Sequence, residues 1–475
     1  MFTIGSRYET KETAGCAYMW DKLTFKSTRD FASDQLTHEL ELLGGQFASN
    51  TTRDLISYQA SVFSKGVEKL MHVLSQIVLY PKYDVDELNE AKENTLWELE
   101  DLQWNNELSL PEKLHQVAYR SSLNPFSGDL NDVNTLGRTM RIHPQQMDSI
   151  NVNNLRQFRD TWFTPDRMVV AAVGINHDDF VLLAEKYFGD VKESSPSIKK
   201  AQQDAIMKCK YTGGTFIKDT TNLPKSPNPD DMVLTHVQIA YESLAVTDPD
   251  IYSLATLASL LGGGGSFSAG GPGKGMYTRL YTQVLNRNGW IESCNHINHT
   301  YRDSGLFGIT ASVLTDKQTH HYVVPVIADQ LAICTQNCTP DELNRAKNQL
   351  KSNLLMNLES KAIQLEDIGR QTLSQDFRMD VGEMCRRIDL VECADIVRVG
   401  RRVILGENIP SRFEFNDNVC KNWNPTGPTV PSIVVEGDLT GSNDSLWKVE
   451  ETLQKWGLMT KTKQSAGRKG FFSRL

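Results

Sequence analysis

A seven-residue motif occurs twice in this chain of 475 residues, and no other feature constrains the fold as much. Residues 86–92 read DELNEAK and residues 341–347 read DELNRAK, so six of seven positions agree at an offset of 255 residues. A strand-like stretch and then a helical one precede each copy: ISYQASVF at 56–63 before the first, and FGITASVL at 307–314 before the second. The same order of elements around both copies predicts an internal duplication.

The duplication places a boundary near the middle of the chain. Residues 192–230 are rich in Lys, Ser, Pro, Asn and Asp, a composition typical of a linker. We therefore expect an N-terminal domain over residues 1–191 and a C-terminal domain over residues 231–475. Strand-like and helical patterns occur in both: VVAAVGI, HVQIAY and SIVVEGD are strand-like, and 85–108 and 340–368 are the longest helical patterns. This mixture predicts two similar α+β domains rather than a doubly wound sheet.

Composition excludes several classes of protein. The net charge is −9, which argues against nucleic acid as the main partner. No run of 18 apolar residues is present, so we expect no transmembrane segment. The cysteines form no CxxC pair and predict free thiols in a reducing compartment. They are Cys16, Cys209, Cys294, Cys334, Cys338, Cys385, Cys393 and Cys420.

A glycine-rich stretch is the strongest local feature. It follows a predicted helix over 248–261, for which Asp248 is the expected N-cap. Eight of the fourteen residues from Gly262 to Gly275 are glycine. A phosphate-binding loop is excluded, because the P-loop motif requires glycine where Ser268 stands and Ser or Thr where Gly275 stands. Two interpretations remain open: a flexible linker, and a loop whose unhindered backbone binds an extended peptide.

The histidines provide no helical zinc motif. A zinc site on a helix needs two neutral ligands one turn apart, and none of the ten histidines forms HExxH or HxxEH. His296 and His299 lie in a strand-like stretch, where a spacing of three places them on opposite faces. We expect both to be ordinary polar residues of a sheet whose hydrogen bonds are satisfied.

A predicted helix near the N-terminus carries three polar residues on one face. In GCAYMWDKLTFKST, at 15–28, Tyr18, Asp21 and Lys22 are spaced i, i+3 and i+4, and Glu98 follows Lys22 by 76 residues. This arrangement resembles the HxxEH helix and distal glutamate of the pitrilysin-type metallopeptidases, or inverted zincins, with FKST standing where those enzymes read FKGT. In that register Tyr18 and Lys22 replace the two histidines. Asp21 replaces the general-base glutamate, and Glu98 keeps the position of the third ligand.

The chemistry of these residues predicts no metal in this chain. Tyr and Lys titrate near pH 10, so neither offers zinc a free lone pair at neutral pH. Lys22 brings a positive charge instead, and we expect an internal ion pair with Glu98 or Asp21 that keeps a buried remnant of the site neutral. Replacing Lys22 by alanine would then destabilise the chain. An exposed helix face with ordinary charges is the alternative.

The resemblance extends over nearly the whole chain. The glycine-rich stretch, DSGLFGI (303–309), RAKNQLKSNLLMNLESK (345–361) and LEDIGRQ (365–371) are similar to segments of non-catalytic α subunits in this family. The resemblance implies a heterodimer in which a β subunit supplies zinc, the general base and peptide hydrolysis. It further implies that the pair removes Arg-rich presequences from precursor proteins imported into the mitochondrial matrix.

The same resemblance assigns the glycine-rich stretch to presequence binding, mostly through its backbone. Its residues are Gly262, Gly263, Gly264, Gly265, Ser266, Phe267, Ser268, Ala269, Gly270, Gly271, Pro272, Gly273, Lys274 and Gly275. Glu359, Glu366 and Asp367 are weaker candidates to hold Arg-rich segments, because acidic residues on a helix are usually just a solvated face.

Two features of the N-terminus depart from the family. Its members carry a transit peptide and then an N-terminal strand before the GSR segment, whereas here Met1 stands four residues before Gly5. We therefore expect the first domain to lack that strand. No import signal is visible, so matrix localisation rests on resemblance alone.

Three functions compete at this point. The first is a substrate-recognition subunit of a heterodimeric metalloendopeptidase. The second is a structural core subunit of the respiratory cytochrome bc complex, which has the same fold but is not expected to keep an intact glycine-rich loop. The third is a self-sufficient zinc peptidase, which the replacement of both helix histidines opposes.

Overall fold

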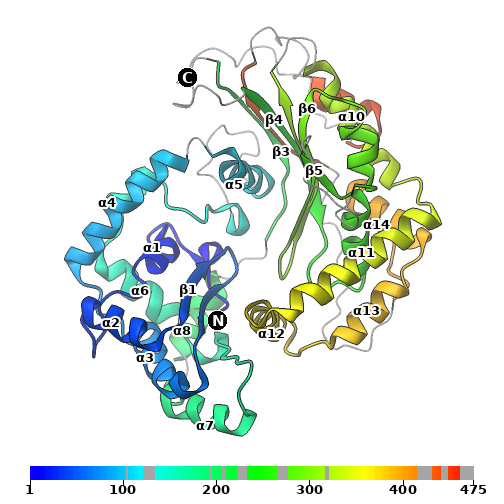
Figure 1. Ribbon diagram of the computed structural model, residues 1–475. Helices are drawn as coiled ribbons and strands as arrows, with labels where there is room; N and C mark the ends of the chain where they lie inside the picture. The colour runs from blue at the N-terminus through cyan, green and yellow to red at the C-terminus, as the bar shows by residue number, and fades with distance from the viewer. Residues whose placement is uncertain are drawn as a thin grey trace.

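In a computed structural model, the described residues are 1–102, 105–120, 134–191, 195–205, 209–221, 233–265, 276–315, 320–413, 430–439 and 448–459. We call residues 1–205 the N-terminal part and residues 209–459 the C-terminal part (Figure 1). Within the described residues, no helix combines the length and apolarity that crossing a membrane requires.

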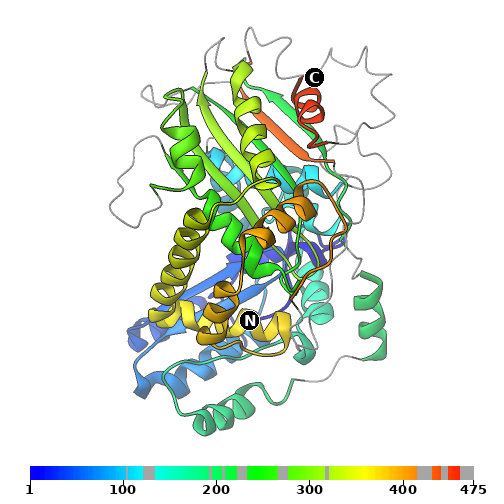
Figure 2. The ribbon, with the colours of Figure 1, turned by 90° about the vertical axis from the view of Figure 1, so that its right-hand side faces the viewer.

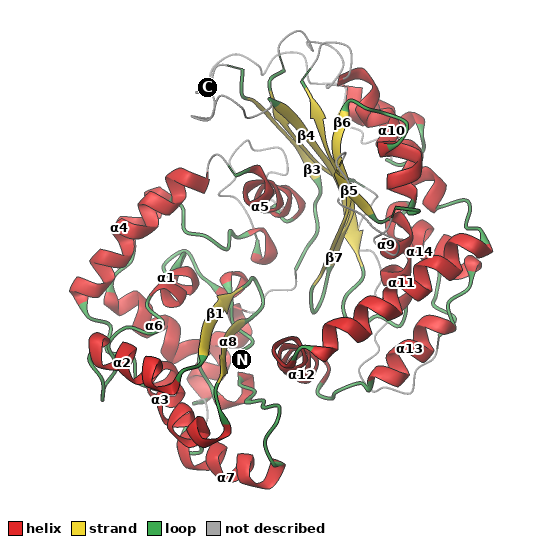
Figure 3. Cartoon of the chain, in the orientation of Figure 1, coloured by secondary structure: helices red, strands yellow, loops and turns green. Residues whose placement is uncertain are grey.

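The N-terminal part is mostly helical, with one small antiparallel sheet (Figure 3). Its helices are α1 (Cys16–Lys22), α2 (Ser33–Leu43), α3 (Val67–Leu79), α4 (Val85–Leu102), α5 (Asn106–Ala118), α6 (Val152–Trp162), α7 (His177–Phe188) and α8 (Pro196–Ala205). Its strands are β1 (Gln46–Thr51) and β2 (Ile56–Ser61). Short 3₁₀ turns are η1 (Ser6–Tyr8), η2 (Ser64–Gly66), η3 (Thr135–Gly137), η4 (Pro144–Ser149) and η5 (Pro165–Arg167).

The C-terminal part is built on a larger sheet, whose described strands have the order β3-β8-β4-β7-β6-β5. They are β3 (Gly214–Asp219), β4 (Leu234–Ser243), β5 (Gly263–Gly265), β6 (Ile291–Thr300), β7 (Gly305–Leu314) and β8 (Ser432–Gly437). Only β3 and β8 are parallel; the other described pairs are antiparallel. Helical elements are α9 (Ile251–Leu261), η6 (Leu280–Leu285), α10 (His320–Cys334), α11 (Pro340–Glu359), α12 (Lys361–Gln375), α13 (Val381–Asp389), α14 (Cys393–Ile404) and α15 (Val449–Lys455).

Alternate residues of this sheet enter two different cores. Val237, Ile239 and Tyr241 of β4 belong to the core that the sheet shares with α9, α10 and α14. Ala240 of the same strand and Val434 of β8 belong to a second core on the opposite face. The period of two along a strand produces this division.

Helix α5 of the N-terminal part fills the second core. Leu110, Leu114 and Val117 of α5 pack with Ile297 and Leu306 of the sheet, as well as Ala240 and Val434. Figure 3 shows α5 on one side of the sheet and α9, α10 and α14 on the other, and Figure 2 views the sheet from the side of α10 and α11. The two parts of the chain therefore share one hydrophobic core.

The turn between β6 and β7 adds polar contacts between the parts. Arg7 donates hydrogen bonds to both carboxylate oxygens of Asp303, at 2.9 and 2.8 Å, and pairs with Asp54 at 2.8 Å. Burial alone would raise the pKa of Asp303, but the Arg7 guanidinium holds it below its usual value. Such bidentate pairs fix geometry as well as charge, so the turn is held in one orientation.

The internal duplication is confirmed by the order of elements. DELNEAK lies at the start of α4 and DELNRAK at the start of α11. The first copy follows β2 and α3, and the second follows β7 and α10. The mixture of helix and sheet expected for an α+β fold is also present.

Several local predictions differ from the structure. The predicted linker, 192–230, contains helix α8 and strand β3. Strand β3 pairs with β8, from Gly214 opposite Ser432 to Asp219 opposite Gly437, and so belongs to the large sheet. The domain limits themselves stay a prediction. Residues 169–175 (VVAAVGI) form no strand, although Val169 exchanges two backbone hydrogen bonds with Met1.

Helix boundaries also differ. The pattern over 340–368 breaks at Ser360, whose extended backbone (ψ 122°) separates α11 from α12. The N-cap of α9 is Asp250, so the prediction of Asp248 is wrong. Arg402 contacts both aspartates at 2.7 Å, so Asp248 is used in a buried ion-pair network instead.

The shared core predicts a large effect of truncation in α5. Leu114 is fully buried in it, so Leu114→Ala is expected to lower the free energy of unfolding by about 2–5 kcal/mol. Leu108→Ala is the matched control, because Leu108 lies on the same helix and is 41% exposed. Denaturant titration of both variants checks the prediction. Equal losses would contradict a special role for the shared core.

Buried His115 and half-buried His299 in this interface predict loss of stability in acid. Tyr301 Oη and Pro111 O lie 2.6 Å from the His115 ring nitrogens. Burial lowers the pKa of His115 well below its ordinary value and that of His299 to about 4, with Arg53 acting in the same direction. The unfolded chain therefore binds more protons. Stability is complete above the unfolded pKa of about 6.5 and falls as the pH drops below it.

The measurement is the midpoint of urea unfolding between pH 7.5 and pH 5. His115→Gln is expected to flatten the decline, because glutamine does not titrate. His177→Gln, at an exposed position in α7, is expected to keep it. An unchanged slope in His115→Gln would contradict the assignment.

Candidate functional site

Helix α1 carries the residues that stand at the metal-site positions of the resembled family. A buried carboxylate holds its first turn: Gly15 N and Ala17 N donate hydrogen bonds to Glu9 at 2.9 and 2.8 Å. Gly15 has φ +83°, and a side chain there would collide with Ile142. Burial raises the pKa of Glu9 to about 7, although the two backbone hydrogen bonds oppose this change. The orientation of α1 thus depends on Glu9 and Gly15.

The structure brings Tyr18 and Lys22 of α1 together with Glu98 of α4. The Lys22 ammonium lies 2.7 and 2.6 Å from the two oxygens of Glu98, and the Tyr18 hydroxyl donates to Glu98 at 2.9 Å. Lys22 also lies over the Tyr18 ring, 5.3 Å from its centroid. The predicted ion pair between Lys22 and Glu98 is therefore confirmed.

Electrostatics at this cluster favour the charged pair. Burial raises the pKa of Tyr18, and the hydrogen bond to Glu98 raises it further, so the phenol stays protonated at neutral pH. Burial alone would raise the pKa of Glu98, but hydrogen bonds from Lys22 and Tyr18 lower it below its usual value. Glu98 is therefore a carboxylate with two donors.

The prediction that the ion pair of Lys22 and Glu98 is buried is wrong. The side chain of Lys22 is 29% exposed and that of Glu98 is 46% exposed. A half-exposed pair is screened by water, so its contribution to stability is small. Asp21 differs from both: its Oδ1 is buried and has no hydrogen-bond partner among the described residues.

These residues do not fit zinc. A zinc ligand donates a lone pair, whereas the Lys22 ammonium and the Tyr18 hydroxyl both use hydrogens to contact Glu98. Among Tyr18, Lys22 and Glu98, only Glu98 is a carboxylate, and the positive charge of Lys22 lies beside it. In the part of the chain that the structure describes, no three His, Cys, Asp or Glu side chains gather in a way that could hold a metal ion.

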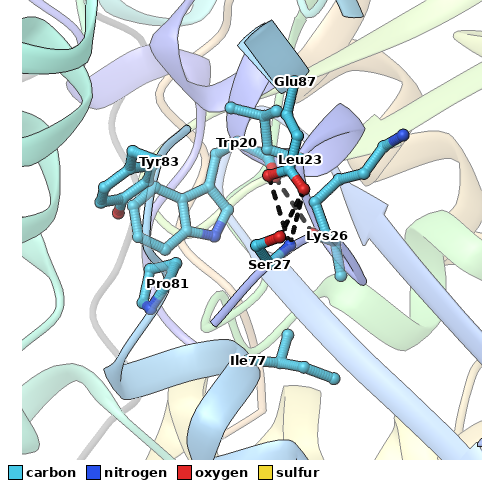
Figure 4. Close-up of a pocket in the computed structure, with 9 residues that line it drawn as sticks. Trp20, Leu23, Lys26, Ser27, Ile77, Pro81, Tyr83 and Glu87 are labelled. Carbon is cyan, nitrogen blue, oxygen red and sulfur yellow. Dashed lines mark hydrogen bonds between the residues drawn. The ribbon is translucent and has the colours of Figure 1, made fainter. Parts of the chain in front are cut away.

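A small pocket lies beside the C-terminal end of α1 (Figure 4). Its lining residues are Trp20, Leu23, Thr24, Lys26, Ser27, Ile77, Pro81, Tyr83 and Glu87. The Ser27 hydroxyl donates to Glu87 at 2.6 Å, and the Ser27 N–H contacts the same carboxylate at 3.2 Å. This serine of FKST therefore ties the segment after α1 to α4, which carries Glu98.

The start of the glycine-rich stretch forms edge strand β5. Gly263, Gly264 and Gly265 pair with β6, and the preceding Gly262 has φ +61°. A side chain at Gly262 would lie 2.3 Å from Thr278, and one at Gly263 would lie 2.5 Å from the carbonyl of Cys294. Glycine is required at both positions by space and by backbone conformation. The predicted residues Ser266, Phe267, Ser268, Ala269, Gly270, Gly271, Pro272, Gly273, Lys274 and Gly275 lie outside the described residues.

His296 holds Gly262, the first residue of the glycine-rich stretch, through two contacts. Its backbone N–H and its Nδ1 both contact the carbonyl oxygen of Gly262, at 3.2 and 2.7 Å. The prediction that His296 is a satisfied polar residue of a sheet is confirmed. Its contact with Gly262 could not be inferred from the sequence, because the contact depends on the register between β5 and β6.

The three weaker acidic candidates have different surroundings. Glu359 is exposed in the last turn of α11. Glu366 of α12 pairs with Arg370 at 2.7 Å, and Asp367 accepts two hydrogen bonds from Gln371 at 2.8 Å. Of the three, Glu366 and Asp367 already have partners on their own helix.

Sequence reasoning missed Glu9, which positions α1. The signal was weak: an acidic residue six positions before Gly15 is too far for the capping box of a regular helix. Only the fold of the intervening turn brings its carboxylate to the helix start.

Comparison with known proteins assigns the class. Residues 1–125 match the family described as "Insulinase (Peptidase family M16)", and residues 149–350 match "Peptidase M16 inactive domain". The chain therefore belongs to peptidase family M16.

Comparison with individual relatives is more specific than the match to the family. The chain is 36% identical over 469 residues to the mitochondrial-processing peptidase subunit alpha of Neurospora crassa, covering 85% of this chain and 78% of the relative. It is 37% identical over 442 residues to the probable subunit alpha of Schizosaccharomyces pombe, covering 93% and 81%. The human subunit alpha is 36% identical over 412 residues, covering 86% and 75%.

A solved structure has the same fold. A chain of complex III2 from Candida albicans, with Inz-5 bound, matches with a TM-score of 0.70, covering 95% of this chain and 93% of the other. Sequence identity is 15%, so this likeness shows the fold alone.

The exposure of the ion pair yields a prediction. Lys22→Ala is expected to lower the free energy of unfolding by less than about 1 kcal/mol, because the pair is half exposed. Arg7→Ala is the comparison, since the Arg7 side chain is 6% exposed and its loss leaves half-buried Asp54 without this cation. It is expected to cost about 3–5 kcal/mol. Denaturant unfolding distinguishes them, and a cost for Lys22→Ala as large as for Arg7→Ala would contradict the prediction.

Proposed function

We propose that this chain is the substrate-recognition, non-catalytic α-type subunit of a mitochondrial processing peptidase. The observation that carries the proposal is the identity of 36–37% to relatives named subunit alpha, over most of their length. The helix α1 residues support it, because Tyr18 and Lys22 offer no ligands for zinc.

In this proposal a β subunit binds the zinc and hydrolyses the peptide bond. The present chain contributes the glycine-rich stretch, Gly262–Gly275, which positions the presequence through backbone groups. The constrained backbone at Gly262 and Gly263 supports this role, since a flexible linker does not require its first residues to be held in one conformation.

Presequences are rich in arginine, so acidic side chains are the complementary partners. Glu359 is the most accessible of the three acidic candidates, whereas Glu366 and Asp367 would have to exchange partners. We place the complex in the mitochondrial matrix on the strength of the proposed substrate.

The alternative is a structural core subunit of a respiratory bc complex. The likeness to complex III2 is one of fold, at 15% identity, and the α-subunit relatives are more than twice as similar in sequence. The alternative is therefore the weaker candidate.

Reconstitution tests the proposal. A fluorescent precursor with an Arg-rich presequence is incubated with the chain alone, with a zinc-bearing β subunit alone, and with both. Cleavage is expected only with both. Deleting Gly262–Gly275 is expected to lower kcat/KM by at least about tenfold, equivalent to about 1.4 kcal/mol of transition-state binding.

Lys22→Ala is the matched control, because it alters the metal-site remnant and leaves the glycine-rich stretch intact. Its cleavage rate is expected to stay within about twofold of the unaltered chain, since the proposal gives Lys22 no part in the reaction. Cleavage by the chain alone, or full activity after the deletion, would overturn the proposal.

A further inference from the structure

Helix α4 has an exposed face that carries acidic residues and a tryptophan. Its core face is formed by Leu88, Ala91 and Thr95, which are all buried. Spacings of three and four residues place a second set of side chains directly opposite that face. These side chains are exposed, and we call them the outer face of α4; they are Asp86, Glu90, Glu93, Trp97 and Glu100. Figure 1 shows α4 along the margin of the N-terminal part.

Trp97 lies in the middle of the outer face and is 71% exposed. An aromatic side chain stabilises a fold by burying its large apolar surface, and Trp97 leaves most of that surface in water. Leu96, which is 41% exposed, extends the apolar surface to one side. The indole of Trp97 is therefore accessible to a ligand from solution.

Most carboxylates of the outer face are not neutralised by the chain itself. Glu90 pairs with Lys26 at 3.3 Å, and Glu90 remains 59% exposed. Asp86, Glu93 and Glu100 have no ion-pair partner among the described residues. From Asp86 to Glu100 the helix rises by about 21 Å, so the outer face is a negative stripe of that length with Trp97 within it.

The duplicated helix α11 shows that the fold does not require such a face. At the offset of 255 residues, Leu343 and Ala346 repeat the buried positions of Leu88 and Ala91. The outer positions of α11 are exposed as well, but their residues differ; they are Asp341, Arg345, Asn348, Ser352 and Leu355. Asp341 alone keeps an acidic group, and no aromatic residue is present. The acidic residues and the tryptophan of α4 are therefore not a consequence of helix packing.

Carboxylates on both sides of an indole are complementary to a segment that is rich in arginine. A guanidinium group stacks on an indole face, and its N–H groups donate hydrogen bonds to carboxylates. Glu93 precedes Trp97 by four residues and Glu100 follows it by three, so both carboxylates lie one helical turn from the indole. Arginine can therefore engage both kinds of group on this face.

We propose that the outer face of α4 docks the Arg-rich presequence of a precursor protein, in addition to the glycine-rich stretch. The identity of this ligand rests on the proposed function. One arginine stacks on Trp97, and neighbouring arginines pair with Glu93 and Glu100. This face contributes to binding and takes no part in hydrolysis, so its loss changes Kd and KM while kcat stays the same.

The first test measures peptide binding by the full chain alone. Fluorescence anisotropy follows a fluorescein-labelled Arg-rich presequence peptide, and the same peptide with glutamine in place of every arginine is the ligand control. The double variant Glu93→Gln/Glu100→Gln is expected to raise Kd about tenfold, and Trp97→Ala about fivefold, because exposed ion pairs and cation–π contacts are individually modest. Added salt is expected to weaken binding to the unaltered chain more than binding to the double variant.

Matched control variants make the same chemical changes at other exposed positions of the N-terminal part. Asp178→Asn/Asp179→Asn removes two carboxylates from α7, and Phe63→Ala removes an aromatic side chain that is 79% exposed. Both controls are expected to bind the peptide within about twofold of the unaltered chain. Equal weakening in the controls and in the outer-face variants would indicate general electrostatic attraction and would overturn the proposal.

Reconstitution with a zinc-bearing β subunit separates this inference from the proposed function. The outer-face variants are expected to raise KM for the precursor, to keep kcat, and to retain the β subunit on co-purification. Cleavage with an unchanged KM in both outer-face variants would overturn the docking site and leave the proposed function standing. Absence of cleavage by the unaltered pair would overturn the proposed function instead. Loss of the β subunit from the outer-face variants would assign this face to a subunit contact and overturn the proposal.

Discussion

The packing of α5 against the large sheet is the contact on which the rest of the structure depends. One face of that sheet is covered by α9, α10 and α14, which follow or precede its strands. The other face is covered by a helix from the first half of the chain, through Leu110, Leu114 and Val117. Removing that helix would expose the apolar residues Ala240 and Val434 in the middle of the sheet. One face of the C-terminal sheet is thus covered by a helix of the N-terminal part.

The same helix connects this shared core to the metal-site remnant. Helix α4 carries Glu98 and ends at Leu102, and α5 begins at Asn106. Glu98 is held by Lys22 and Tyr18 at one end, and Ser27 binds Glu87 on the same helix α4. The position of α1 against α4 is therefore fixed by several polar contacts, while α5 anchors the pair to the sheet. The hydrogen bonds that Tyr18 and Lys22 donate to Glu98 hold α1 against α4 at this point.

Patterns with a period or a spacing could be read from the sequence, and contacts across the fold could not. The repeated seven-residue motif gave the paired order of elements. The family resemblance, which placed Lys22 and Glu98 at positions of one metal site, led to the prediction of an ion pair of Lys22 with Glu98 or Asp21, and the pair with Glu98 is present. Its exposure depends on how α4 lies against α1, which no local pattern encodes. Residues 169–175 alternate like a strand, yet strand formation also requires a neighbouring strand in register. The composition of 192–230 concealed β3, because a short edge strand carries little apolar signal.

The glycine-rich stretch and the metal-site remnant follow different physical requirements. An ion pair of Lys22 with Glu98 needs only two long side chains near a surface, and many substitutions would satisfy it. Gly262 and Gly263 tolerate no side chain, because Thr278 and β6 fill the space where one would stand. A backbone so constrained presents its N–H and C=O groups in a fixed direction at the edge of a six-stranded sheet. The glycine-rich stretch is therefore constrained by space at its start, whereas the contact of Lys22 with Glu98 is constrained only by charge and by the reach of two side chains.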